Sequence, residues 1–398
     1  MKKSIIIPII FALVGTCFVS YSFLDTFIIP KNTKKVNLDK NVDDFFDEPL
    51  PSSSISGAPF SSSSQSSVSS SSKPQNSSSS LNSSESQSSS AISSSVSSSS
   101  SSEAPQNVIN YYEDKTEEEI NALFTSEVVF KEREHYSDPD IYIDITTHRD
   151  EADTTTYYVA DIRIKHLKYL KTALAKDTFG ENVQEKTSEI CKRKKGILAI
   201  NGDFYGAQEA GYVLRNGESL RSTISKSNVG ENPRKNPEDL AIYRDGTFEI
   251  FNEHDYTLED IKNKGAWQVF SFGPGLIKDN EIVVGERDEV ATALSGGRNQ
   301  RTIIGMISPL HYVFFVNDAR LTNEEGFSLY EAANIMKDLH CYCAYNLDGG
   351  GSSTMYLDNG TGNADKLAHL VNKPTQNFRG KTGSIEQRDV SDIIYIGK

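Results

Sequence analysis

The sequence has few cysteines and no excess of positive charge, and both shortages exclude classes of protein. Four irregularly spaced cysteines in 398 residues exclude a disulfide scaffold. Cys341 and Cys343 stand one residue apart with no second pair after them, which disfavours a zinc site. They and Cys191 are expected either to be buried free thiols or to form one bond, from Cys191 to Cys341 or Cys343. The formal net charge of −14 disfavours nucleic-acid binding, which requires a basic surface.

Several catalytic and nucleotide-binding motifs are also missing. The chain contains neither G-x-x-x-x-G-K-S/T nor a G-x-G-x-x-G run between a strand and a helix, the loops that bind nucleotide phosphates. It lacks the G-x-S-x-G elbow of serine hydrolases as well. No internal repeat is visible.

A serine-rich segment divides the chain. Between residues 52 and 102, 33 of 51 positions are serine, and such a segment buries too little apolar surface to offset its conformational entropy. We therefore expect three parts, which are an N-terminal membrane anchor at 1–30, a disordered linker at 31–106, and one domain at 107–398.

The first part has the composition of a transmembrane segment. Lys2 and Lys3 precede an apolar stretch from Ile5 to Leu24, and about 20 apolar residues span a bilayer. A cleaved signal peptide is the alternative, although no small-x-small cleavage site is visible. Lysines flank the stretch on both sides, so charge does not orient it. We interpret the serine-rich segment as a spacer, and expect a single-pass protein of the cell membrane with an extracellular C-terminal domain.

Hydrophobic periodicity predicts an α+β domain, strand-rich and mixed, with a few packed helices. Strands are expected at 141–145, 157–164, 197–200, 240–244, 247–251, 267–271, 281–284, 302–307, 311–316 and 393–396. Helices are expected at 117–125, 182–195 and 326–340, the first behind a Thr116–Glu119 capping box. Asp245-Gly246 predicts a hairpin turn. Strands and helices do not alternate regularly, which favours a single α+β domain.

One run carries more information than any other part of the chain. It reads Asn346-Leu347-Asp348-Gly349-Gly350-Gly351-Ser352-Ser353 and follows an apolar approach. Three consecutive glycines cost chain entropy, so the run indicates that a group, such as a ligand, approaches the backbone closely. Ser352 and Ser353 are interpreted as hydrogen-bonding neighbours rather than nucleophiles, because the elbow motif is missing.

Two further segments end apolar strands with polar residues. Asn201-Gly202-Asp203 follows one strand, and Asn317-Asp318-Ala319-Arg320 follows another and adds a cation. Arg301 stands just before the strand at 302–307. Sites are often built at strand ends, and guanidinium groups suit phosphate or carboxylate. Ordinary turns and structural arginines are the alternative interpretation.

These segments, in this order, resemble the phosphodiester glycosidase family over roughly 140–398. The resemblance is carried by residues 199–205, 272–276, 301–305, 317–320, 326–333, 346–353, 371–374 and 386–390. One departure is Ala319, where the family usually has glycine before the arginine.

The resemblance implies hydrolysis of a sugar-1-phosphodiester to free sugar and a phosphomonoester. An oxocarbenium-like transition state requires carboxylates, and a phosphate leaving group requires cations. The implied catalytic carboxylates are Asp348, as the principal one, and Asp203, Asp318 and Glu331. The implied substrate-binding residues are Asn201, Arg301, Arg320, Asn346, Gly349, Gly350, Ser352, Ser353, Asn372 and Arg388. Whether a metal or another cofactor takes part stays open.

The expected partners are a sugar-phosphate or glycan substrate and the membrane. The leading hypothesis is an extracellular, membrane-tethered enzyme that acts on a cell-surface glycan. A catalytically silent protein that binds envelope polysaccharide is the main alternative, and a serine esterase that uses Ser352 is a third.

Overall fold

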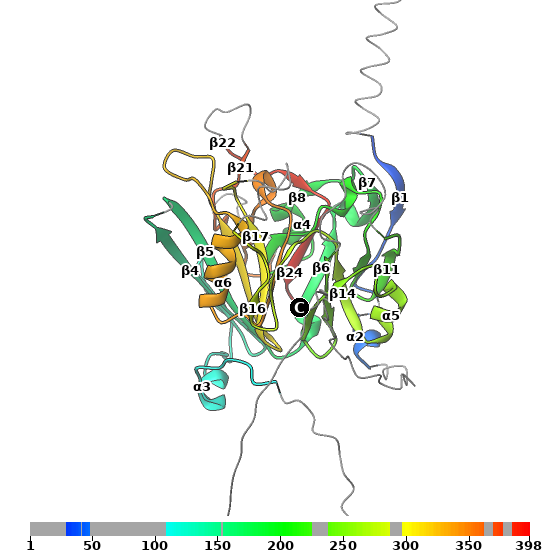
Figure 1. The fold of residues 1–398 in the computed structure, drawn as a ribbon. Helices are drawn as coiled ribbons and strands as arrows, with labels where there is room; N and C mark the ends of the chain where they lie inside the picture. Colours follow the sequence, from blue (N-terminus) through cyan, green and yellow to red (C-terminus); the bar gives the residue numbers. More distant parts are fainter. Residues whose placement is uncertain are drawn as a thin grey trace, which may run out of the picture. The chain divides into compact units, whose positions relative to one another are not determined.

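The structure is a computed structural model that describes residues 29–40, 42–47, 109–152, 154–224, 238–286, 297–361, 369–376 and 384–398. In these residues antiparallel strands predominate and the helices are few and short, so the domain is α+β as expected (Figure 1).

The largest sheet has nine strands in the order β16-β15-β19-β17-β18-β5-β4-β3-β2. Their bounds are β2 Val129–Lys131, β3 His135–Ser137, β4 Ile141–Asp150, β5 Thr155–Ile164, β15 Gly275–Lys278, β16 Glu281–Ile282, β17 Thr302–Ser308, β18 His311–Asn317 and β19 Cys343–Asn346. Every neighbouring pair in this sheet is antiparallel.

Two smaller antiparallel sheets complete the framework. The five-stranded sheet comprises, in spatial order, β11 Glu218–Arg221, β10 Val213–Arg215, β14 Ala266–Phe270, β12 Glu238–Tyr243 and β13 Phe248–Asn252. The four-stranded sheet comprises β20 Met355–Leu357, β9 Leu198–Asn201, β24 Asp392–Ile396 and β6 Leu170–Leu174. Three strand pairs join β1 Lys31–Lys35 to β7 Thr178–Glu181, β21 Thr375–Gln376 to β22 Ser384–Ile385, and β23 Asp389–Val390 to β8 Glu185–Lys186. The predicted Asp245-Gly246 turn joins β12 to β13.

The apolar strands are buried on both faces, and this explains their nearly continuous apolar sequences. In β17, Ile304 and Met306 belong to the main core, while Ile303 and Ile307 point to the opposite face. Successive side chains of a strand point to opposite faces, so both faces of this sheet need a cover. The main core contains residues from all three larger sheets, and α6 covers the other face of the nine-stranded sheet (Figure 1).

The helices are α2 Val42–Asp47, α3 Glu117–Asn121, α4 Thr187–Arg193, α5 Leu258–Asn263 and α6 Leu329–Asp338. The predicted capping box at Thr116 and Glu119 is present in α3. The helices predicted at 182–195 and 326–340 are confirmed but shorter. α4 packs on the four-stranded sheet and α5 on the five-stranded sheet.

The N-terminal strap, defined as residues 31–40 and 42–47, belongs to the domain. Its strand β1 pairs with β7, and the Val36 amide donates to the Asp177 carbonyl at 3.0 Å. Val36 and Leu38 are buried against Leu174 and Tyr205. The prediction of a linker from residue 31 is therefore wrong for these residues.

Two aromatic residues of α2 also pack the strap against the rest of the domain. The ring centroids of Phe45 and Phe46 each lie 4.8 Å from that of Trp267. These apolar side chains give the strap enough surface to bury, which the serine-rich composition that follows does not. The interpretation of the serine-rich segment as a spacer stays a prediction, because that segment lies outside the described residues.

Other predictions concern residues outside the described ranges. The apolar stretch at 5–24 and the serine-rich segment at 52–102 both lie there. Among the described residues, no helix has the length and apolar character needed to cross a membrane. Cys191, Cys341 and Cys343 are buried free thiols, which decides between the two alternatives left open by the sequence.

Candidate active site

Strand ends from two sheets meet at one place and carry the predicted site segments. β9 ends at Asn201 and β19 at Asn346, while β17 begins at Thr302 and β18 ends at Asn317. The Thr302 hydroxyl donates to Asn201 Oδ1 at 2.9 Å and so joins the four-stranded sheet to the nine-stranded sheet. The structure therefore brings together segments that the sequence marked only by a shared pattern.

Asn201 holds the turn that contains Asp348. Its Nδ2 donates to the Asp348 carbonyl at 2.7 Å, and the Asp348 amide donates to the Gly202 carbonyl at 3.3 Å. Asn201 Oδ1 also accepts from the Thr354 amide at 3.2 Å. Asn201 is fully buried and its contacts lie within the protein, which supports a positioning role rather than the predicted contact with substrate.

The three glycines accommodate protein groups, not an open space for ligand. A Cβ atom on Gly349 would lie 2.7 Å from the Gln300 carbonyl oxygen. On Gly350 it would lie 2.9 Å from Arg320 Nη2, and on Gly351 it would lie 2.8 Å from Arg388 Nη2. Gly350 also has φ +59°, a conformation that side chains disfavour. The prediction of a close approach is confirmed, but two arginines and a carbonyl make it.

Arg320 and Arg388, which we call the arginine pair, lie side by side along the glycine run. The pKa of Arg320 is lowered, first by burial and then by the positive charge of Arg388. The Arg388 amide donates to the Gly351 carbonyl at 3.4 Å, which fixes the backbone of this residue. Within the described ranges, neither guanidinium group has a carboxylate within ion-pair distance. Two adjacent cations without carboxylate partners make this place a candidate anion site.

Asp348 lies next to this anion site. Burial raises the pKa of its carboxyl group to about 6, while Ser352 and Arg388 oppose the shift and the charge of Asp203 adds to it. The residue keeps some exposure, but its Oδ2 atom is buried and has no hydrogen-bond partner in the described part of the chain. This buried carboxylate oxygen therefore keeps its acceptor capacity unused among the described residues.

Asp203 does not present a free carboxylate. Its Oδ1 accepts from Arg215 Nη2 at 2.7 Å and from the Tyr205 amide at 3.2 Å, and its Oδ2 accepts from the Ser271 amide at 2.9 Å. Arg215 Nε also donates to Asp392 Oδ2 at 2.9 Å. The predicted catalytic role of Asp203 is not supported, because both of its oxygens are occupied by partners in a fully buried cluster.

Asp318 is also enclosed. The Tyr158 hydroxyl donates to its Oδ2 at 3.0 Å, and the Lys373 amide donates to its Oδ1 at 2.8 Å. Burial raises the pKa of Asp318 to about 6. Asn372, the neighbour of Lys373, donates to the Ser353 carbonyl at 3.0 Å. Asp318 and Asn372 thus attach the 372–373 segment to the site, and their predicted contacts with substrate are not supported.

Two predicted residues have structural partners elsewhere. Glu331 caps α6 through the Ser328 amide at 2.8 Å and pairs with Arg298 at 2.6 Å. The buried Arg301 donates from Nε to the Phe327 carbonyl at 2.9 Å and from Nη2 to the Gly297 carbonyl at 2.7 Å. These contacts support structural roles for Glu331 and Arg301, and they give no support to the catalytic and binding roles predicted for them.

The remaining predicted residues line the turn itself. Asn346 Nδ2 donates to the Gly273 carbonyl at 2.8 Å, and its Oδ1 has no partner among the described residues. The hydroxyl oxygens of Ser353 and Thr302 lie 3.0 Å apart. Ser352 is fully buried, and its hydroxyl has no partner within normal hydrogen-bond geometry in the described ranges, although it lies close enough to Asp348 to lower the pKa of that carboxyl group. Beside the arginine pair, the turn thus holds three buried polar atoms without a normal hydrogen bond in the described ranges, which are Asp348 Oδ2, Asn346 Oδ1 and Ser352 Oγ.

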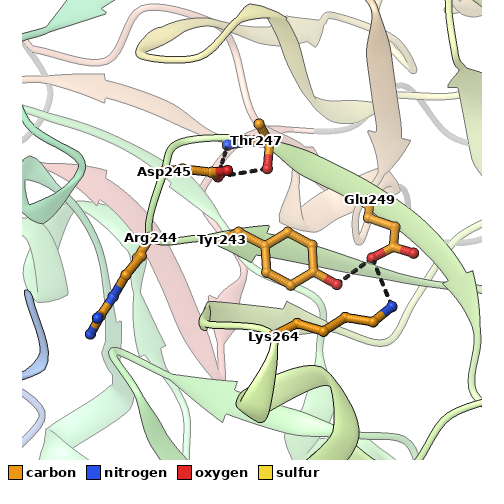
Figure 2. A pocket seen from close by; sticks show the side chains of 6 residues that line it. All are labelled: Tyr243, Arg244, Asp245, Thr247, Glu249 and Lys264. Carbon is orange, nitrogen blue, oxygen red and sulfur yellow. Dashed lines mark hydrogen bonds and ion pairs between the residues drawn. The ribbon is translucent and has the colours of Figure 1, made fainter. Parts of the chain in front are cut away.

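Two cavities among the described residues differ in their relation to this site. A hollow of about 480 Å³ adjoins Asp318, and Tyr158, Asn372 and Lys373 line it together with Arg133, Glu134 and Thr147. A cavity of about 270 Å³ lies at the β12–β13 turn, and Figure 2 shows Tyr243 and Lys264 there, both directed to Glu249. The second cavity contains none of the predicted site residues.

No metal site is evident in what the structure describes. Among those residues, no three His, Cys, Asp or Glu side chains converge to hold a metal ion. Arg215 and Asp392 were missed by sequence reasoning, and no local signal marks them, because each is a single charged residue at the end of an apolar strand.

Comparison with known proteins identifies a matching family. Residues 194–397, just over half of the chain, match the model of a family described as phosphodiester glycosidase. The SPbeta prophage-derived uncharacterized protein YomE of Bacillus subtilis (strain 168) is 26% identical over 175 residues, which are 44% of this chain and 26% of that protein. The chain thus spans about a quarter of the length of this curated relative.

Two solved structures are also similar to the chain. The catalytic domain of zebrafish N-acetylglucosamine-1-phosphodiester alpha-N-acetylglucosaminidase, auto-inhibited by its pro-peptide, has a TM-score of 0.49 and 19% identity, over 73% of this chain and 96% of that one. A hypothetical protein from Synechocystis has a TM-score of 0.42 and 14% identity, over 65% and 62% of the two chains.

Proposed function

Because this chain belongs to the phosphodiester glycosidase family, we propose that it hydrolyses a sugar-1-phosphodiester to free sugar and a phosphomonoester. Membership supports a glycosidase-type function, and the site suggests the substrate. The observation that carries the proposal is the arginine pair beside an oxygen of Asp348 that has no hydrogen-bond partner in the described part of the chain. A phosphodiester joined to an anomeric carbon presents an anion and an electrophilic carbon as neighbours, which matches this arrangement.

The arginine pair is proposed to bind the phosphate. Arginine offers planar pairs of N–H donors that match phosphate oxygens. When the bond from the anomeric carbon to the phosphate oxygen breaks, the electron pair leaves with the phosphate. Donors already aimed at that oxygen stabilise the charge as it develops.

Asp348 is proposed to face the anomeric carbon. Of the four predicted carboxylates, it alone keeps an oxygen without a hydrogen-bond partner in the described part of the chain. Its pKa of about 6 makes it mainly ionised at pH 7, so it can stabilise an oxocarbenium-like transition state. Water supplies the hydroxyl of the released sugar.

The hollow beside Asp318 is proposed to receive the group esterified to the phosphate. Asp318 contacts Tyr158 and Lys373 in its wall, and Arg320 follows Asp318 by two residues. An extended chain spans about 3.3–3.6 Å per residue, so the Cα atoms of Asp318 and Arg320 are at most about 7 Å apart. The hollow therefore lies within reach of a substrate held by the arginine pair.

We also propose that the enzyme acts outside the cell on a surface glycan, with residues 1–30 as its anchor. The apolar stretch ends at Leu24 and β1 begins at Lys31, so such an anchor would hold the domain close to the membrane. Protease treatment of intact cells tests this, since digestion of the domain is expected only if it faces outward.

The experiment for the activity uses the full chain, including the strap, with a panel of sugar-1-phosphodiesters. We expect release of reducing sugar and phosphomonoester by the wild type and none by Asp348→Asn, which should still bind inorganic phosphate. An absence of turnover across the panel, with glycan binding retained in both proteins, would instead support the silent polysaccharide-binding alternative.

A further inference from the structure

The buried cluster formed by Arg215, Asp203 and Asp392 lies directly behind the candidate active site. All three side chains have no exposed surface. Arg215 bridges the two carboxylates, at 2.7 Å to Asp203 and 2.9 Å to Asp392, and it also donates to the Leu214 and Val269 carbonyls. A side chain that donates to two carboxylates and two carbonyls at once needs several N–H donors in a fixed planar arrangement. Among the side chains, only the guanidinium group of arginine provides this.

One arm of the cluster reaches Asp348 through the end of β9. The Gly202 amide donates to the Asp392 carbonyl at 2.9 Å, and a Cβ atom on Gly202 would lie 2.2 Å from Asp392 Oδ1. Gly202 is thus packed directly on the carboxylate that Arg215 holds. The Gly202 carbonyl in turn accepts the Asp348 amide at 3.3 Å. The position of Asp392 therefore sets the position of the Asp348 backbone.

A second arm reaches the other side of the same turn. Asp203 accepts the Ser271 amide at 2.9 Å, and Ser271 stands two residues before Gly273. The Gly273 carbonyl accepts Asn346 Nδ2 at 2.8 Å, and Asn346 stands two residues before Asp348. Contacts from Arg215 therefore lead to the turn from both sides.

We propose that Arg215 is a positioning residue for the candidate active site, which holds Asp348 in place through Asp392–Gly202 on one side and Asp203–Ser271 on the other. The kinetic part of this proposal rests on the proposed function, whereas the structural part does not. A buried ion pair that loses one partner leaves an uncompensated charge, so substitution has to retain charge to remain informative.

The test compares Arg215→Lys with Arg193→Lys in the full chain. Lysine retains the charge but lacks the fork. Arg193 is the matched control, because it also pairs with two carboxylates, Asp177 and Glu185, but at the surface end of α4. Hydrogen exchange is followed in the peptide 346–353, which contains the Asp348 amide, and in the α6 peptide 329–338.

For Arg215→Lys we expect exchange in 346–353 to be at least tenfold faster with exchange in α6 unchanged, and a kcat at least tenfold lower with an unchanged KM. For Arg193→Lys we expect neither change. Unchanged exchange in 346–353 of a folded Arg215→Lys protein would overturn the proposal, and so would equal acceleration in both peptides. If the lysine variant does not fold, Asp392→Asn has the same expected local pattern and the same overturning results.

The exchange readout separates this proposal from the proposed function. Faster exchange in 346–353 alone supports the positioning role even when the wild type turns over none of the substrates, and only the proposed function then fails.

Discussion

Substitution of Gly351 by alanine distinguishes two explanations of the glycine run. A Cβ atom there would lie 2.8 Å from Arg388 Nη2 and 3.0 Å from Nε, so the guanidinium group has to move. The φ of Gly351 is not positive, so alanine adds no backbone strain and the fold should keep its stability. The perturbation therefore acts on Arg388 while the surrounding turn is preserved.

The magnitude follows from the hydrogen bonds that Arg388 makes to a phosphate. A hydrogen bond to a charged group contributes about 1.5–3 kcal/mol. Misplacing the guanidinium group should cost about one such bond, which is a loss of about 10- to 150-fold in affinity. Calorimetric titration with inorganic phosphate measures this loss, and thermal unfolding checks that the fold is retained.

The decisive comparison is the same substitution in an Arg388→Gln background. If Gly351 serves to make room for Arg388, alanine should then have almost no further effect on phosphate affinity. An equal loss in both backgrounds would mean that the new methyl group meets the ligand itself. An unchanged affinity in the wild-type background would mean that Arg388 does not hold the anion, and either result refutes the reasoning.

Three further predictions address Asp348, α6 and the strap. Because the folded-state pKa of Asp348 is raised to about 6, its ionisation should destabilise the fold progressively between about pH 4 and pH 6. Asp348→Asn should therefore be more stable than the wild type at pH 7, with a free energy of unfolding up to about 3 kcal/mol larger and a higher melting temperature. This difference should vanish towards pH 4. Equal melting temperatures of the two proteins at both pH values would contradict the prediction. Glu331→Ala should lose about 1 kcal/mol of stability with kcat unchanged, since it removes the cap of α6, and a large loss of kcat at unchanged melting temperature would restore a catalytic role. Phe45→Ala should lose about 2 kcal/mol in denaturant unfolding, because it removes a half-buried ring from Trp267, whereas no change would show that the strap contributes nothing to stability.

Much of the framework could be predicted from the sequence because its strands are long and apolar. β17 and β18 were expected at nearly their observed bounds, and the Asp245-Gly246 turn places β12 beside β13. Short strands such as β6 were missed because five residues without flanking turn signals carry little information. The strap was missed although Phe45 and Phe46 are visibly apolar, since the serine-rich composition after it dominated the interpretation.

Only those parts of the site that local sequence patterns mark could be predicted. Polar residues at strand ends correctly indicated that Asn201 and Asp348 lie together. Tertiary structure decides which side chains form ion pairs. The pairing of Asp203 with Arg215, 12 residues apart in the sequence, could therefore not be predicted from local patterns. Glu331 is a different case, because Ser328-x-x-Glu331 is a capping-box pattern, a local signal from which its structural role could have been predicted.

The central claim concerns which bond is broken, and hydrolysis in ¹⁸O-labelled water tests it most directly. Cleavage between the anomeric carbon and the phosphate oxygen places the label in the hydroxyl of the released sugar. We predict labelled sugar and unlabelled phosphomonoester from the wild-type full chain, and neither product from Asp348→Asn. Label in the phosphomonoester, with unlabelled sugar, would mean attack at phosphorus and would contradict a glycosidase mechanism at this site.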